Sequence, residues 1–98
     1  EIAVDDMRSI AINLREKVKS GVVVLSTISG GKPLLVAAVS PEAIKLGIKA
    51  GDLIKIGSTT LGGGGGGKDD FAQGGGIDAS AITKALKEIT LLIEGKVN

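Results

Sequence analysis

The sequence predicts an α/β (α+β) domain in which helices flank a small central β-sheet that carries an N-terminal hairpin and a glycine-rich loop. Two apolar, β-branched runs at 22–28 and 33–39 enclose a short turn that contains Gly-Gly, which is the pattern of a β-hairpin. Both runs are almost continuously hydrophobic, so helices are expected to cover both faces of the sheet. Helical periodicity at both ends of the chain supplies candidates for those helices.

The first predicted helix spans residues 4–19. Its apolar residues recur every three or four positions, with acids near the start and bases near the end, as the helix dipole favours. The stripe consists of Val4, Met7, Ala11, Leu14 and Val18, and Ile10 broadens it. This spacing suits a helix that packs on a core. It also suits the end of a longer connecting helix, or a surface for self-association.

Two shorter helices are expected after the hairpin. Ser40 can cap the first, with Pro41 at its opening position. A joint is expected near Gly47, and a second helix can restart at Ala50 and end between 57 and 61.

A final helix is expected after the second glycine cluster. Asp78 or Ser80 can cap it, and its apolar face carries Ile82, Ala85, Leu86, Ile89 and Leu92. Residues 95–98 are expected to form a tail.

Length and composition indicate a single domain of 98 residues. Residues 1–20 are assigned to the N-terminal helix and 21–98 to a globular part with glycine-rich loops at 62–67 and 74–76. The sequence contains neither Cys nor His, which excludes disulfides and disfavours zinc binding, Cys nucleophiles and His acid–base chemistry. No signal peptide or membrane span is evident, so a cytoplasmic location is expected.

The charge balance and aromatic content constrain the binding partner. The formal net charge is +1, so a basic surface would have to come from the arrangement of charges. Phe71 is the only aromatic residue, which argues against binding a single strand by repeated base stacking. Phe71 is expected mainly to anchor the core.

The glycine run at 62–67 is the most informative segment. A flexible linker is one explanation. The other is close approach of bare backbone to a ligand, because successive glycine N–H groups can hold an anion and Lys68 can add a cation. The run matches the start of a Walker nucleotide-binding loop, but Asp69 replaces the hydroxyl residue that binds magnesium. Asp69 and Asp70 are expected in a solvated turn, and Gln73 either completes a turn or contacts a phosphate or base.

The segment Gly62 to Lys68, followed by Asp70-Phe71-Ala72-Gln73 and Gly75-Gly76, resembles the C-terminal signature of alanyl-tRNA synthetases. The preceding order of helix, hairpin and Lys49-Ala50-Gly51-Asp52-Leu53-Ile54 is similar too. The likeness extends to the wider DHH-associated group. Its phosphodiesterase-linked members carry a His after the glycines, where this chain has Lys68. The family usually has Pro at the position of Asp69 and another small residue at that of Gly74.

The resemblance implies a module without catalytic residues or metal ligands. The ATP and zinc sites of the parent ligase would belong to other domains. The implied partners are tRNA(Ala), whose outer corner the module would contact so that the aminoacylation and editing domains act on one tRNA, the other synthetase domains, and a second copy in a homodimer. The predicted nucleic-acid contacts are Lys68, Lys32, Lys49, Lys55, Gln73, Gly64, Gly65, Gly66, Gly67, Gly75 and Gly76.

Overall fold

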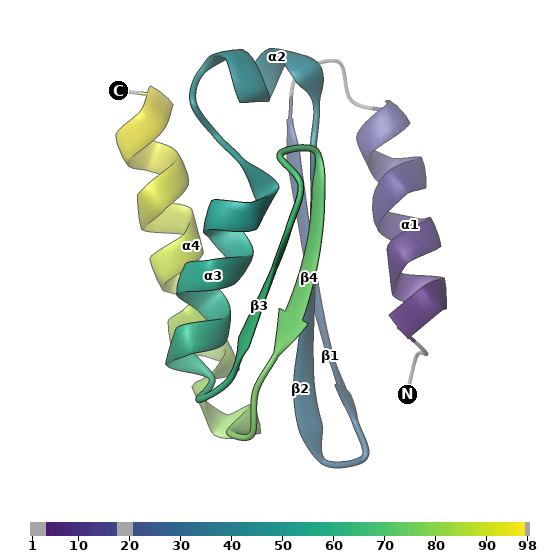
Figure 1. Cartoon of the computed structure of the whole chain (residues 1–98), viewed down its shortest axis with the longest axis vertical. Coiled ribbons are helices and arrows are strands. Elements are labelled where there is room, and N and C mark those ends of the chain that lie inside the picture. The colour runs from purple at the N-terminus through teal and green to yellow at the C-terminus, as the bar shows by residue number, and fades with distance from the viewer. Residues whose placement is uncertain (1–3, 18–20, 98) are drawn as a thin grey trace.

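The computed structural model describes residues 4–17 and 21–97, and it shows a four-stranded antiparallel sheet with helices on both faces (Figure 1). The predicted α+β class is therefore confirmed. The strand order is β1-β2-β4-β3. The strands are β1 (Val22–Ser29), β2 (Lys32–Val39), β3 (Gly64–Gly67) and β4 (Phe71–Gly75).

The predicted hairpin is formed by β1 and β2, whose register runs from Val22↔Val39 to Ser29↔Lys32. Its two-residue turn has φ of 59° at Gly30 and 79° at Gly31. Positive φ at both central turn residues matches the right-handed twist of the strands, and glycine adopts it without a Cβ penalty.

The helices are α1 (Val4–Lys17), α2 (Pro41–Lys45), α3 (Ala50–Thr60) and α4 (Ile82–Val97), with a short 3-10 turn, η1 (Ala79–Ala81), before α4. Figure 1 shows α1 on one face of the sheet and α3 and α4 on the other. Ser40 caps α2 as expected, and Asp78 caps η1. Positions 18 and 19 of the first predicted helix lie outside the described residues.

The tail expected at 95–98 is wrong over 95–97, because α4 continues to Val97, and position 98 lies outside the described residues. Gly95 costs a helix about 1 kcal/mol relative to Ala. Leu92 and Ile93 lie just before it and pack against the core. Their burial offsets the weak local preference, and the helix runs on.

The core has two parts, one on each face of the sheet. Leu35, Ala37 and Val39 of β2 join the larger cluster with residues of α3 and α4. Val36 and Ala38, which alternate with them, pack against Met7 and Ala11 of α1 in the smaller cluster. Because successive strand residues face opposite sides, a continuously apolar β2 serves both helical layers.

The expected glycine loops at 62–67 and 74–76 are wrong in part, because most of these glycines lie in strands, whereas Gly62, Gly63 and Gly76 lie outside them. Gly64–Gly67 is the edge strand β3, and Gly74 and Gly75 belong to β4. Helix α3 lies close against these strands. A Cβ at Gly74 would stand 2.4 Å from the Oγ of Ser58 on α3. One at Gly65 would stand 3.0 Å from the Cγ2 of Ile54 on α3 and 2.4 Å from the Cα of Gly74 on the neighbouring strand. Glycine has a low strand propensity, but here only bare backbone lets the helix approach.

Candidate nucleic-acid interface

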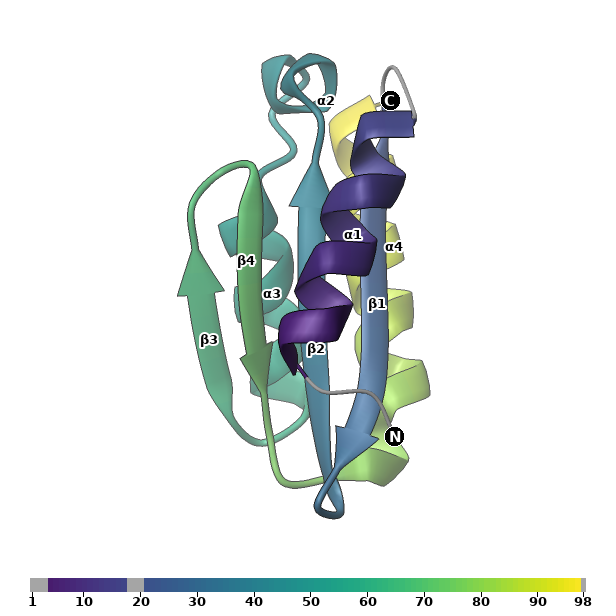
Figure 2. The same ribbon diagram turned by 90° about the vertical axis from the view of Figure 1, so that its right-hand side faces the viewer.

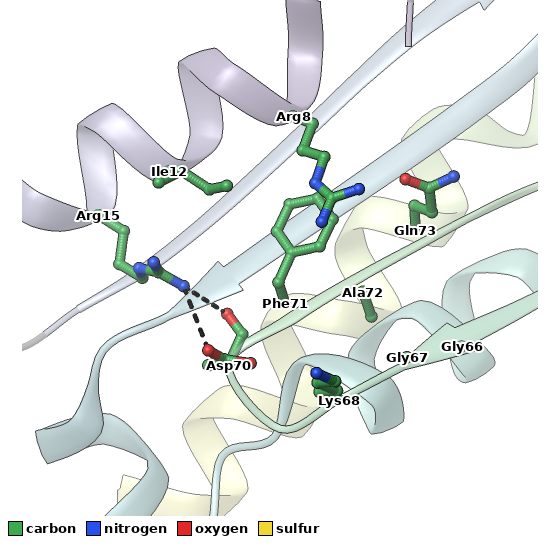
Figure 3. A pocket seen from close by; sticks show the side chains of 10 residues that line it. All are labelled: Arg8, Ile12, Arg15, Gly66, Gly67, Lys68, Asp70, Phe71, Ala72 and Gln73. Atoms are coloured by element: carbon green, nitrogen blue, oxygen red, sulfur yellow. Dashed lines mark hydrogen bonds and ion pairs between the residues drawn. The ribbon is translucent and has the colours of Figure 1, made fainter. Parts of the chain in front are cut away.

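Half of one sheet face is left open. Helix α1 packs on β1 and β2, and Figure 2 shows β3 and β4 uncovered beside it. A hollow of about 340 Å³ lies between α1 and these strands. Figure 3 shows the residues that line it: Arg8, Ile12, Arg15, Gly66, Gly67, Lys68, Asp70, Phe71, Ala72 and Gln73.

Positive charge gathers around this hollow. Arg8 and Arg15 reach it from α1, and Lys68 from the turn between β3 and β4, against the single carboxylate of Asp70. The chain as a whole has a net charge of only +1. The fold therefore concentrates cations that the overall composition does not reveal.

The two arginines are held differently. Arg15 Nη1 donates to the main-chain carbonyl of Asp70 at 3.0 Å and lies 3.9 Å from the Oδ2 of the same residue. The guanidinium carbon of Arg8 lies 5.0 Å from the centroid of the Phe71 ring. This distance is within the range of a cation–π interaction. The Phe71 ring also packs against the smaller core cluster, so its predicted anchoring role is confirmed.

The floor of the hollow includes bare backbone. Gly66 is paired with Gln73 on β4, so both face the same side of the sheet. A Cβ at Gly66 or Gly64 would meet nothing within 4 Å, and neither residue has a positive φ. Neither packing nor backbone conformation therefore requires glycine at these two positions.

The structure brings together only some of the predicted contacts. Lys68, Gln73, Gly66 and Gly67 line the hollow. Gly65 faces α3 instead. Gly75 and Gly76 are also packing glycines, because their Cβ atoms would lie 2.6 Å from the Pro33 carbonyl oxygen and 2.3 Å from that of Leu61.

The other predicted lysines lie elsewhere. Lys32 follows the β1–β2 turn, at the end of the sheet opposite the β3–β4 turn that carries Lys68 (Figure 1). Lys55 is exposed on α3, across the sheet from the hollow. Lys49 is the N-cap residue of α3.

The first amides of α3 are already bonded. The N–H groups of Ala50 and Gly51 donate to the carbonyl oxygens of Asp69 and Lys68 at 2.8 and 3.1 Å. This helix end therefore fixes the β3–β4 turn, and those two amides serve the protein rather than a ligand. The turn itself, with exposed Asp69 and Asp70, agrees with the expected solvated turn.

The contribution of Arg8 was missed by sequence reasoning, and Arg15 was noted only as a favourable charge near a helix end. The signal was present, because Arg8, Ile12 and Arg15 follow one another at spacings of four and three on one helix face. The spacing could not show that this helix face lines the same hollow as the glycines of β3.

Within residues 4–17 and 21–97, no group of three or more acidic side chains is placed to hold a metal ion, and no helix is long and apolar enough to cross a membrane.

The fold and the hollow define a class: an α+β module whose four-stranded sheet is half open on one face and bordered there by cations. The family model of the DHHA1 domain matches residues 1–95. The chain belongs to the DHHA1 domain family.

Named relatives agree with this assignment. The chain is 48% identical over 89 residues to an alanine–tRNA ligase of Herpetosiphon aurantiacus, covering 91% of this chain and 10% of that protein. It is 46% identical over 83 residues to the Acidothermus cellulolyticus enzyme, covering 84% and 9%. The chain thus spans about a tenth of the length of these relatives.

A solved structure shares the fold. The C-Ala domain of Aquifex aeolicus alanyl-tRNA synthetase superposes with a TM-score of 0.82 at 36% identity, over 96% of this chain and 81% of that one. The predicted resemblance to the C-terminal domain of alanyl-tRNA synthetases is confirmed.

Proposed function

We propose that this chain is a tRNA-binding module of an alanyl-tRNA synthetase. It contacts the outer corner of tRNA(Ala) and so helps the aminoacylation and editing domains of the same enzyme act on one tRNA. The observation that carries the proposal is the open hollow, which Arg8, Arg15 and Lys68 line together with the bare backbone of Gly66 and Gly67.

The chemistry of this surface suits folded RNA. Phosphates dominate the electrostatics of nucleic acids, and lysine or arginine contacts release condensed counterions. Folded RNA is recognised largely through its shape, its phosphates and its 2′-hydroxyl groups, so a row of aromatic side chains is unnecessary. Bare backbone at Gly64 and Gly66 allows a ligand to approach the sheet closely.

The proposal assigns no catalytic step to this chain. Ligation and editing, with their ATP and zinc, are assigned to other domains of the enzyme, which would be the chain's protein partners. The proposed place of action is the cytoplasm.

Binding of labelled tRNA(Ala) tests the proposal. Fluorescence anisotropy is measured at several salt concentrations, with an unstructured RNA of equal length as the control. The expected result is saturable binding that prefers the tRNA and weakens as salt rises. Absence of binding at low salt, or equal binding of the unstructured RNA, would contradict recognition of tRNA shape.

Self-association through α1 is the alternative role. Ile10 and Leu14, one helical turn apart, are each 40% exposed. Met7 and Ala11 of the same predicted stripe are already buried against the sheet. A dimer surface on this helix must therefore use Ile10 and Leu14 rather than the full stripe. Sedimentation across a range of concentrations distinguishes the two roles, because a strict monomer excludes the alternative for this chain.

A further inference from the structure

The cations around the hollow are not equivalent, because Arg8 is placed over an aromatic ring. We infer that Arg8 and Phe71 together form a stacking platform for one unpaired nucleobase of the RNA, with Gln73 beside it to contact the edge of the base. This inference rests on the proposed function and adds a base subsite to a surface otherwise suited to phosphates.

The guanidinium of Arg8 is the accessible part of the platform. The Phe71 ring is half-buried and packs against the smaller core cluster, and Arg8 lies over it. Arg8 itself is exposed and lines the hollow. A guanidinium group is planar and weakly hydrated, and it stacks on rings. The Phe71 ring lies on one side of the Arg8 guanidinium, 5.0 Å from its carbon, and a base would take the side that faces the hollow.

Gln73 is suitably placed to contact a base held there. It lies two residues after Phe71 on β4, so both side chains face the same side of the sheet. Figure 3 shows Gln73 and Arg8 among the residues that line the same hollow. The amide group has both a donor and an acceptor, as the edges of nucleobases do. Gln73 is exposed, and among the described residues its side-chain amide has no hydrogen-bond partner.

The hollow also has room for a base. Its volume of about 340 Å³ lies within the usual range for small-ligand sites. Apart from Gly66 itself and its two chain neighbours, no heavy atom lies within 4 Å of the place where a Cβ of Gly66 would stand, and Gly66 is paired with Gln73. Lys68 and Arg15 line the same hollow, and they can meet the phosphates that flank the base.

A phosphate-binding role and a base-stacking role of Arg8 predict different results for a lysine substitution. If Arg8 only neutralises a phosphate, lysine should replace it, because the charge is kept. If Arg8 stacks on a base, lysine should fail, because it has no planar group. Arg15→Lys is a matched control, since Arg15 lies on the same helix and lines the same hollow but is bonded to Asp70.

The experiment uses the whole chain and a panel of tRNA(Ala) transcripts. Each transcript carries 2-aminopurine, or an abasic nucleotide, at one unpaired loop position of the outer corner. Two control transcripts carry the same modifications, 2-aminopurine or an abasic nucleotide, in the anticodon loop. Binding constants and 2-aminopurine fluorescence are measured for the unmodified chain, Arg8→Lys and Arg15→Lys.

The expected result is that one outer-corner position changes its fluorescence when the unmodified chain binds. Arg8→Lys should abolish this change and weaken binding about tenfold, with an unaltered salt slope. The abasic transcript at that position should bind Arg8→Lys and the unmodified chain equally well. Arg15→Lys should keep the fluorescence change even if the affinity falls, because this substitution leaves Arg8 over Phe71.

Two results would overturn the inference. If tRNA binds but no position responds, or if Arg8→Lys behaves like the unmodified chain, the base subsite is wrong and the proposed function stands. If no transcript binds at low salt, the proposed function and the subsite fail together.

Discussion

Arg15 on α1 and Asp70 in the β3–β4 turn are joined across 55 positions of sequence, because Arg15 Nη1 donates to the Asp70 carbonyl oxygen at 3.0 Å. The side chain of Arg15 is only 18% exposed, whereas that of Asp70 is 57% exposed. The contact ties the helix that forms one wall of the hollow to the turn that carries Lys68. Its main-chain component should matter more than its ion pair, because the 3.9 Å approach of the carboxylate is solvated.

Arg15→Ala should therefore lower the free energy of unfolding by about 1 kcal/mol, the usual net value of a hydrogen bond. Asp70→Asn keeps the carbonyl and should cost less than about 0.5 kcal/mol, since exposed ion pairs contribute little. Urea denaturation of both variants measures the difference. Equal losses would show that the carboxylate is the main partner of Arg15.

Gly65 and Gly66 are neighbours that should respond oppositely to alanine. A Cβ at Gly65 would lie 2.4 Å from the Cα of Gly74 and 2.7 Å from the carbonyl oxygen of Gln73, so Gly65→Ala should destabilise the fold by about 2 kcal/mol or more. At Gly66 a Cβ meets nothing, so Gly66→Ala should leave stability within about 1 kcal/mol or raise it.

Denaturant unfolding and tRNA affinity should be measured on both glycine variants. If the bare face at Gly66 serves the RNA, Gly66→Ala should weaken binding while the fold stays stable. A strongly destabilised Gly66→Ala would mean that packing, rather than a ligand, requires glycine there.

The same substitution, lysine to glutamine, at Lys68 and at Lys32 tests which end of the sheet binds tRNA. Lys68→Gln should lower tRNA affinity and reduce the slope of log K against log salt by about 0.7–0.9, the contribution of one phosphate contact. Lys32→Gln should leave the slope unchanged, because Lys32 lies at the opposite end of the sheet. A loss only with Lys32→Gln would move the interface to the β1–β2 turn.

Ser40 and Ser58 are both buried hydroxyls with opposite hydrogen-bonding states. The Oγ of Ser40 accepts from the N–H groups of Gly21 at 2.9 Å and Ala43 at 3.3 Å. Ser40→Ala should therefore cost about 1–2 kcal/mol, the usual loss for a helix cap. Among the described residues the Oγ of Ser58 has no hydrogen-bond partner, so Ser58→Ala should be neutral or stabilising.

Thermal and urea unfolding of the two serine variants, made in the same background, provide the comparison. Both substitutions remove the same buried hydroxyl group, so the difference between their unfolding free energies measures the hydrogen bonds of Ser40. A similar cost at both positions would indicate that Ser58 is bonded in solution.

Several elements were predictable from local sequence because neighbouring residues determine them. Gly30 and Gly31 have the positive φ that a two-residue hairpin turn requires, and the hairpin formed as expected. Ser40 and Pro41 began α2 for reasons that concern only the first helical turn. The continuous apolarity of 33–39 indicated correctly that helices cover both faces of the sheet.

The glycine segment could not be read in this way, because local propensity and tertiary packing disagree there. Isolated glycines favour loops, and a run of them favours a flexible linker. In the fold a Cβ at Gly65 would meet the backbone of β4 and one at Gly74 would meet Ser58 of α3, so the close packing of strands and helix requires glycine at both positions. The same long-range packing divides the run into glycines that face α3 and glycines that face the open hollow.

The sequence by itself determined the fold class, the hairpin, the caps and the family, all of which depend on residue types at short spacings. The tertiary structure decided that Gly64–Gly67 form an edge strand, that the turns next to Lys32 and Lys68 lie at opposite ends of the sheet, and that Arg8 lies over Phe71. Those outcomes depend on which face α1 and α3 cover. The burial of apolar surface between segments far apart in the chain determines where these helices pack, and a local sequence pattern does not predict it.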